Sequence, residues 1–197
     1  MNERVRIIVP HRGLAAAKTR LAPVLAPEER VTLARELLQR VLRVSREAVD
    51  DVVVITPSAE LAGVVEAIGA TLVVQRGMGL NEGLDQARGD ALEAGVTLLG
   101  VLHGDLPNLR ADDIRALLAA TPLPRGVAIA PDRSGSGTNG LALRPPDAVP
   151  FAFGTGSFAA HLAAAEDAAV VMQRPGLAFD LDTPADLARW LELGDAA

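Results

Sequence analysis

The fold is decided by the stretch LLGVLHGDLP at residues 98–107, where an apolar run of strand length leads into a glycine, one carboxylate and a proline. Such a run predicts a central strand of an α/β sheet. Ligands of open α/β sheets bind beyond the carboxyl ends of the strands, which is where Asp105 would lie. Asp105 is therefore predicted to be a metal-binding or catalytic carboxylate. The alternative is that it closes the following turn through an Asx-type hydrogen bond.

The composition is that of a soluble globular protein. A chain of 197 residues suits a single domain, 1–197, and 49% hydrophobic with 22% charged residues is ordinary for a globular protein. The net charge of -6 argues against nucleic acid and anionic membranes as partners. The absence of cysteine excludes disulfides and a thiolate metal site. Because we find no signal-like segment and no apolar run of about 18 residues, we expect no membrane span and a cytoplasmic protein.

A basic loop follows the first predicted strand. The β-branched run VRIIVP at residues 5–10 predicts that strand, and residues 11–21 after it contain Arg12, Lys18 and Arg20 but no acid. Arginine offers a forked donor and lysine a compact charge, so this loop suits a polyphosphate. It has neither the Walker A pattern nor the glycine fingerprint of dinucleotide-binding folds. The alternative is an ordinary solvated loop.

Further strands and helices alternate along the chain. Helices are predicted from residue 27 to about 44 and from 112 to about 120, and strands at 51–56, 71–75 and 126–130. The second strand ends without the acid that holds the ribose in a nicotinamide-binding Rossmann unit, which argues against a dehydrogenase. Asn81 precedes a helix that begins near Glu82. It is predicted either to cap that helix or to present its amide to a nucleobase.

Two segments rich in small residues are candidate anion sites. In residues 131–140, backbone N–H groups freed by glycine and the Thr138 hydroxyl can form an anion nest, the alternative being a flexible linker. The turn at 153–158 contains Gly154 and predicts Ser157 as the cap of a helix, whose free N–H groups attract anions. His161 lies four residues after Ser157 on the same helix face, although a lone helix histidine is usually structural.

Two further aspartates precede the last helix. In FDLDTP at residues 179–184 the threonine–proline pair predicts a helix start, which leaves Asp180 and Asp182 on extended chain. Residues i and i+2 of a strand share a face, so both carboxylates should point one way and Leu181 into the core. At about 6.5 Å they would repel by roughly 2–3 kcal/mol, a cost that a divalent cation removes. Oxygen ligands without cysteine favour Mg²⁺ or Mn²⁺ over zinc.

The candidates form a set. Three acids (Asp105, Asp180, Asp182), two anion nests and a cationic loop indicate metal-dependent chemistry on a nucleotide phosphate.

Seven motifs, in order along nearly the whole chain, carry a family resemblance. They are VPHR (9–12), AKTRL (17–21), LNE (80–82), DLP (105–107), GTN (137–139), FG with GSF and His161 (153–161), and FDLDTP (179–184). Together they resemble the phosphoenolpyruvate / 2-phospho-L-lactate guanylyltransferases of deazaflavin coenzyme F-420 biosynthesis. The departures, among them His11 where an aromatic is frequent and Asn108 in place of an aliphatic residue, touch none of the three acids.

The resemblance implies a fold and a set of site residues. The fold is a single-domain, three-layer nucleotidyltransferase (Rossmann-like) α/β fold with a mixed, mostly parallel sheet. The implied metal ligands for Mg²⁺ are Asp105, Asp180 and Asp182. The implied acceptor-binding residues are Thr138, Gly154 and Ser157, and Lys18 and Arg20 fall at phosphate-handling positions. Asn81 falls near the base, and Arg12 and His161 complete the expected substrate-binding set.

The implied reaction is transfer of GMP from GTP to phosphoenolpyruvate or 2-phospho-L-lactate, with release of pyrophosphate. One alternative is an enzyme of the same fold acting on 3-phosphoglycerate, a sugar phosphate or a molybdenum-cofactor precursor. Another is a module that binds GTP without turning it over. The sequence leaves the acceptor and the oligomeric state open.

Overall fold

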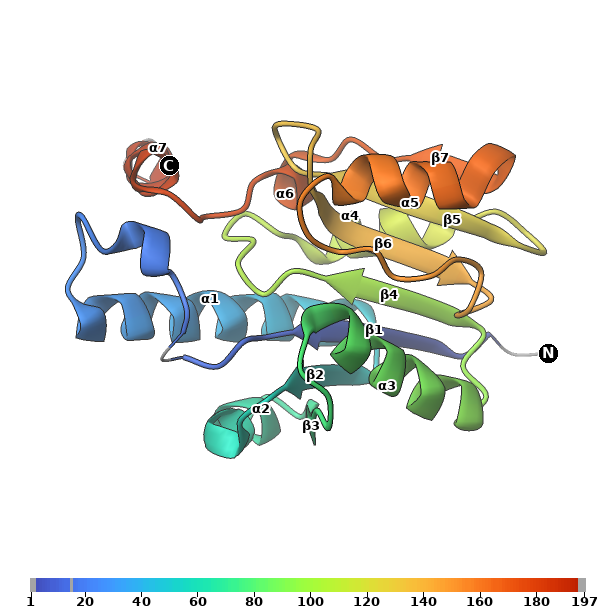
Figure 1. The fold of residues 1–197 in the computed structure, drawn as a ribbon, viewed down its shortest axis with the longest axis horizontal. Helices are drawn as coiled ribbons and strands as arrows, with labels where there is room; N and C mark the ends of the chain where they lie inside the picture. The colour runs from blue at the N-terminus through green and yellow to red at the C-terminus, as the bar shows by residue number, and fades with distance from the viewer. Residues whose placement is uncertain (1–2, 15, 195–197) are drawn as a thin grey trace.

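A seven-stranded sheet organises the molecule. A computed structural model of the chain describes residues 3–14 and 16–194. The strand order is β3-β2-β1-β4-β6-β5-β7, with helices on both faces (Figure 1). Neighbouring strands are parallel except β6, which is antiparallel to both β4 and β5. The predicted α/β class with a mixed, mostly parallel sheet is confirmed.

The strands are β1 (Val5–Pro10), β2 (Val52–Thr56), β3 (Thr71–Val74), β4 (Leu98–Leu102), β5 (Gly126–Pro131), β6 (Thr138–Arg144) and β7 (Ala169–Val171). The α-helices are α1 (Pro27–Ala48), α2 (Ala62–Glu66), α3 (Leu80–Glu93), α4 (Ala111–Ala119), α5 (Ser157–Ala165), α6 (Pro175–Ala178) and α7 (Pro184–Gly194). None of the helices in the described ranges is both long and apolar enough to cross a membrane.

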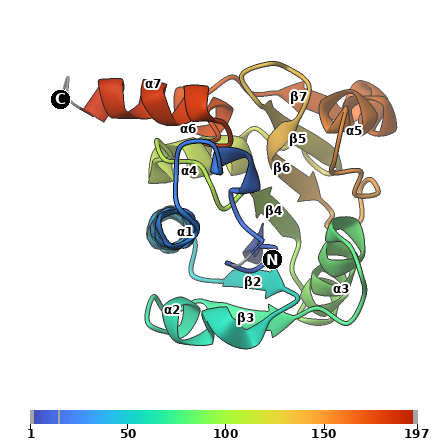
Figure 2. The same ribbon diagram turned by 60° about the vertical axis from the view of Figure 1, so that its left-hand side comes forward.

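The helices form a layer on each side of the sheet. Figure 2 shows α1 and α4 on one face and α3 and α5 on the other. Every residue of β4 is buried, because helices cover both faces of the sheet at this central strand. A smaller cluster around Leu21, Leu37 and Leu181 holds α7 against the start of α1. Leu181 is fully buried, as predicted.

The strand order places a ligand crevice at one edge of the sheet. Successive strands run from β1 through β2 to β3 on one side, whereas β4 pairs with β1 on the other. In open α/β sheets, ligands bind at such a switch point, beyond the carboxyl ends of the strands. The loop that follows β1 carries Lys18, and the loop that follows β4 carries Asp105. The fold therefore brings these two residues to one place.

Several predicted boundaries differ from the structure. Helix α1 continues to Ala48 rather than ending near residue 44. The N-cap of α3 is Gly79, so Asn81 lies inside the first turn and does not cap the helix. The N-cap of α5 is Gly156, whose φ of 73° suits glycine, so the prediction that Ser157 caps this helix is wrong. The predicted start of α7 is confirmed, because Thr183 and Asp186 exchange hydrogen bonds.

Candidate active site

A cavity of about 750 Å³ opens at the predicted edge of the sheet. This volume lies within the range of small-molecule sites. Its lining combines charged side chains with apolar ones. The charged lining residues are Arg12, Lys18, Arg20, Asp105, Asp180 and Asp182. The cavity thus gathers six of the residues predicted from the sequence.

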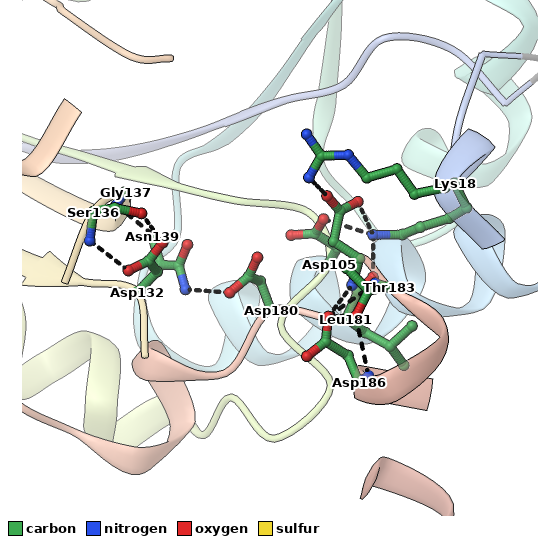
Figure 3. A network of polar contacts seen from close by, with 12 residues as sticks. Lys18, Asp105, Asp132, Ser136, Gly137, Asn139, Asp180, Leu181, Thr183 and Asp186 are labelled. Carbon is green, nitrogen blue, oxygen red and sulfur yellow. Dashed lines mark hydrogen bonds and ion pairs between the residues drawn. The ribbon is translucent and has the colours of Figure 1, made fainter. Parts of the chain in front are cut away.

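Lys18 and Asp105 form a hydrogen-bonded ion pair in the cavity. The Lys18 ammonium donates to Asp105 Oδ2 at 2.6 Å and to the Leu181 carbonyl oxygen at 2.5 Å (Figure 3). Only 6% of the Lys18 side chain is exposed. Its backbone is left-handed, with φ of 54°, which is uncommon for a residue other than glycine. Lys18 therefore joins the end of β4 to the segment before α7.

The other two predicted metal ligands face different partners. Asp182 accepts a hydrogen bond from Arg20 Nη1 at 2.8 Å, and its Oδ1 lies 3.8 Å from the Lys18 ammonium. Asp180 Oδ1 accepts from the Asn139 amide at 3.2 Å. The segment that carries both acids is not part of a strand, so the shared face predicted for them does not arise from sheet pairing.

Metal binding by the three aspartates stays a prediction. Among residues 3–14 and 16–194, no three His, Cys, Asp or Glu side chains stand close enough together to hold an ion. The physical reason is that the Lys18 ammonium lies between Asp105 and Asp182. Even so, Asp105 Oδ1 is a buried oxygen without a hydrogen-bond partner in the described part of the chain. That oxygen is chemically suited to a cation.

The acids at this site titrate differently. Burial alone would raise the pKa of Asp105, but the Lys18 ammonium and nearby His103 outweigh it and lower the pKa below its usual value. Asp180 has no such cation: burial, together with the charge of Asp105, raises its pKa against the opposing hydrogen bond from Asn139. A cation placed between the two carboxylates would favour the ionised form of both.

Thr138, Ser157 and His161 form a second, buried cluster. The Thr138 backbone N–H donates to Ser157 Oγ at 2.9 Å, and Thr138 Oγ1 lies 3.0 Å from His161 Nδ1. His161 Nε2 accepts from the Ala152 backbone N–H at 3.0 Å, so Nδ1 carries the hydrogen and donates to Thr138. Gly154, by contrast, is exposed at the surface turn before α5. The structure thus brings together Thr138, Ser157 and His161, three of the six residues expected to bind substrate.

One aromatic ring separates this cluster from the cavity. The Phe153 ring packs edge-on against His161, with centroids 4.8 Å apart, and lies 5.7 Å from the His103 ring, which lines the cavity. Thr138 and Ser157 are themselves almost fully buried. Their role in binding the acceptor stays a prediction.

His161 is neutral at physiological pH. Burial lowers the pKa of His161 to about 4. We expect its ring signals in an NMR titration to shift with a midpoint near pH 4, rather than near the ordinary value of about 6.5. The chain has three histidines, so a His161→Gln variant assigns the signal. A midpoint near pH 6.5 would contradict the buried, hydrogen-bonded ring.

Both the oxygen and the nitrogen of the Asn81 amide are hydrogen-bonded to the backbone of the turn before α5. Its Oδ1 accepts from the Phe153 N–H at 2.9 Å, and its Nδ2 donates to the Phe153 carbonyl at 3.1 Å. This pairing ties the start of α3 to the second cluster. Contact between Asn81 and a nucleobase stays a prediction.

The glycine-rich loop fills its own predicted anion nest. The Asp132 carboxylate accepts hydrogen bonds from the backbone N–H groups of Ser136 and Gly137, both at 2.9 Å (Figure 3). Burial alone would raise the pKa of Asp132, but the hydrogen bond from the Ser134 hydroxyl, together with these two, lowers it. The prediction of an open nest is therefore wrong, because a carboxylate of the same loop occupies it.

Two residues of the site were not assigned a role from the sequence. His103 lines the cavity two residues before Asp105, and its Nε2 is buried without a partner among the described residues. Asn139 holds Asp180, as described above. His103 could have been found from its place beside Asp105. Asn139 was noted only as the last residue of the GTN motif (137–139), and its contact with Asp180 could not be found, because residues 131–140 look like an irregular loop.

Comparison with known proteins identifies relatives over most of the chain. A family model described as "Guanylyl transferase CofC like" matches residues 5–196. The chain is 48% identical over 185 residues to phosphoenolpyruvate guanylyltransferase of Sphaerobacter thermophilus, covering 91% of this chain and 89% of that protein. It is 43% identical over 186 residues to the protein of the same name from Rubrobacter xylanophilus, covering 92% and 91%.

Solved structures agree on the fold. A nucleotidyl transferase from Methanothermobacter thermautotroptrophicus superposes with a TM-score of 0.70 at 17% identity, covering 98% of each chain. A 4-diphosphocytidyl-2C-methyl-D-erythritol synthase from Anaerococcus prevotii gives a TM-score of 0.64 at 10% identity, covering 96% of each. The three-layer fold predicted from the sequence is thus that of nucleotidyltransferases.

Proposed function

This chain belongs to the CofC-like guanylyl transferase family, and from that membership we propose that it transfers GMP from GTP to phosphoenolpyruvate and releases pyrophosphate. The observation that carries the proposal is the single cavity in which Lys18 and Arg20 face three aspartates at the switch point of the sheet. The place of this reaction in deazaflavin coenzyme F-420 biosynthesis is part of the proposal and rests on the family resemblance.

In the proposed reaction, a phosphate oxygen of the acceptor attacks the α-phosphorus of GTP in line. The bond from that phosphorus to the oxygen bridging the β-phosphate breaks, and pyrophosphate leaves with that oxygen. The nucleophile is already an anion, so no general base is needed. Catalysis then consists of alignment and charge neutralisation. Arg20, 73% exposed at the rim, is free to turn toward phosphate, whereas Lys18 would act from its buried position.

A divalent ion, Mg²⁺ or Mn²⁺, would be held by Asp105, Asp180 and Asp182. The donor set fits such an ion, because all three side chains offer carboxylate oxygens to one cavity and Asp105 Oδ1 lacks a partner in the described chain. When bound, the ion would supply charge stabilisation to the phosphates. Since the carboxylates do not yet form a joint group, ion binding would have to draw them together.

The apolar side chains of the cavity suit the nucleobase. They are Ile55, Pro57, Met78 and Leu80, and the Met78 side chain is 95% exposed. A flat base placed against these side chains would bury apolar surface, which is favourable. The triphosphate would then extend toward the basic loop.

The experiment that tests the function is pyrophosphate release with a panel of substrates. We expect release with GTP and phosphoenolpyruvate in the presence of Mg²⁺, and less with 2-phospho-L-lactate, 3-phosphoglycerate or a sugar phosphate. GTP should exceed ATP and CTP. Release with a sugar phosphate alone would instead indicate a different nucleotidyltransferase of this fold, and GTP binding without release would indicate a sensing module.

Replacing Ser157 with alanine is expected mainly to weaken acceptor binding. The change leaves the buried Thr138 N–H without its acceptor, so the second cluster loses its fixed shape. We expect the KM for phosphoenolpyruvate to rise about tenfold, the equivalent of roughly 1.4 kcal/mol, while the KM for GTP stays within about twofold. Steady-state kinetics measure both constants. An effect confined to the KM for GTP would reassign this cluster to the nucleotide.

A further inference from the structure

Asn139 sits at an irregularity in the sheet. Along the β5–β6 pair, Ala130 is opposite Gly140, but the next residue, Pro131, is opposite Thr138. The register shift leaves Asn139 as an extra residue of β6, which is the definition of a β-bulge. Bulges bend a strand locally and redirect a side chain. The redirected side chain is the amide of Asn139, a residue that is only 3% exposed.

Both amide hydrogens of Asn139 have partners. Nδ2 donates to the Leu177 carbonyl oxygen at 3.0 Å. It also donates to Asp180 Oδ1 at 3.2 Å (Figure 3). The bond to Leu177 attaches Asn139 to the end of α6. The bond to Asp180 fixes the position of one oxygen of its carboxylate. Asp180 lines the cavity, so its second oxygen, Oδ2, is left for a bound group.

The backbone of Asn139 is hydrogen-bonded to the segment that joins β4 to Asp105. Its carbonyl oxygen accepts from the His103 N–H at 3.1 Å, two residues before Asp105. A second link joins the same segments directly, since the Leu181 N–H donates to the Asp105 carbonyl at 3.1 Å. The backbone of Asn139 is thus bonded to the end of β4, and its side chain is bonded to Asp180.

We infer that Asn139 is a positioning residue that holds Asp180 for the divalent ion. This inference rests on the proposed function, in which Asp180 is one of three carboxylates around that ion. Asn139 acts through Asp180 and does not touch the substrates. An apolar side chain of similar size could fill the same space, but it would leave both the carboxylate oxygen and the Leu177 carbonyl without a donor.

The test measures Mn²⁺ binding in the absence of nucleotide, by electron paramagnetic resonance of the free ion. The proteins are the wild type, Asn139→Ala, Asp180→Asn and the double variant. Losing the hydrogen-bond partner of a metal-ligating carboxylate typically weakens metal binding 10–100-fold, so we expect at least about a tenfold weaker affinity in Asn139→Ala. In the Asp180→Asn background the same change should cost less than about twofold, because the carboxylate through which Asn139 acts is gone.

A matched control separates this effect from a general loosening of β6. Leu143 lies on the same strand, is fully buried and belongs to the core on the α3 and α5 face. Leu143→Ala is expected to lower the melting temperature but to leave Mn²⁺ affinity within about twofold. If Asn139→Ala does not fold, Asn139→Ser provides the same test, because its hydroxyl is too short to reach Asp180.

Each outcome decides the inference. Unchanged Mn²⁺ affinity in Asn139→Ala, with a wild type that binds Mn²⁺ and releases pyrophosphate, overturns the positioning role alone. Equal weakening in both backgrounds also overturns it, because Asn139 would then act independently of Asp180. A wild type that releases pyrophosphate but binds no Mn²⁺ overturns the metal assignment together with the inference. A wild type that binds Mn²⁺ with the expected pattern but releases no pyrophosphate supports the positioning role and removes the proposed reaction.

Discussion

Asp105→Asn is expected to lower turnover at least about 100-fold, with the protein still folded. The substitution keeps the shape of the side chain but removes the charge that faces both the Lys18 ammonium and the proposed ion. Removing one charge-stabilising group from a preorganised site costs about 3 kcal/mol, which corresponds to that factor. Pyrophosphate release at saturating GTP and phosphoenolpyruvate measures the effect.

The control for this variant is Asp112→Asn. Asp112 is an acid on the first turn of α4, its side chain is 82% exposed, and its carboxylate pairs with neighbouring Arg115. We expect its turnover to stay within about twofold of the wild type. Turnover near the wild-type value in Asp105→Asn, with circular dichroism unchanged, would remove Asp105 from the chemistry.

Lys18→Met is expected to impair both stability and turnover. The methionine keeps the length of the side chain but leaves the Asp105 carboxylate and the Leu181 carbonyl without the ammonium. Removing one partner of a buried ion pair lowers the free energy of unfolding by about 3–5 kcal/mol. We expect about 3 kcal/mol here, because a quarter of the Asp105 side chain is exposed. Urea unfolding measures the loss of stability, and we expect at least about a 100-fold loss of turnover.

The same variant should reverse the response to acid. In the wild type the pKa of Asp105 is lowered, so its contribution to stability is present above the unfolded-state pKa and is lost as pH falls through the folded-state pKa. Without Lys18, burial would raise that pKa, and protonation would then relieve an unpaired carboxylate. We expect Lys18→Met to recover part of its lost stability between pH 7 and pH 5. A parallel loss of stability in both proteins over that interval contradicts the role of Lys18 as the partner of Asp105.

The edge of the sheet was predictable because its residues follow simple strands. The apolar run before Asp105 forms β4, and the run before the basic loop forms the adjacent parallel strand β1. Parallel neighbours deliver their following loops to the same edge, so Lys18 and Asp105 had to meet there.

The contacts that hold the site together were not predictable from the sequence. Asp180 and Asp182 line the same cavity, as their spacing suggested, but the spacing did not indicate that Asn139 binds the first and Arg20 the second. The contact made by Asn139 could not be predicted, because the residue lies in a stretch rich in glycine and serine and no sequence pattern marks the β-bulge. Ser157 has the chemistry of a cap, yet Gly156 takes that place, since a left-handed backbone costs glycine little.

The central claim is that this cavity joins the phosphate of phosphoenolpyruvate to the α-phosphorus of GTP. The most direct measurement is the fate of an ¹⁸O label carried on the three non-bridging phosphate oxygens of phosphoenolpyruvate, followed by mass spectrometry of both products. All of the label should remain in the guanylylated product and none should enter pyrophosphate. Label in pyrophosphate, or label lost to inorganic phosphate without a guanylylated product, would contradict the claim.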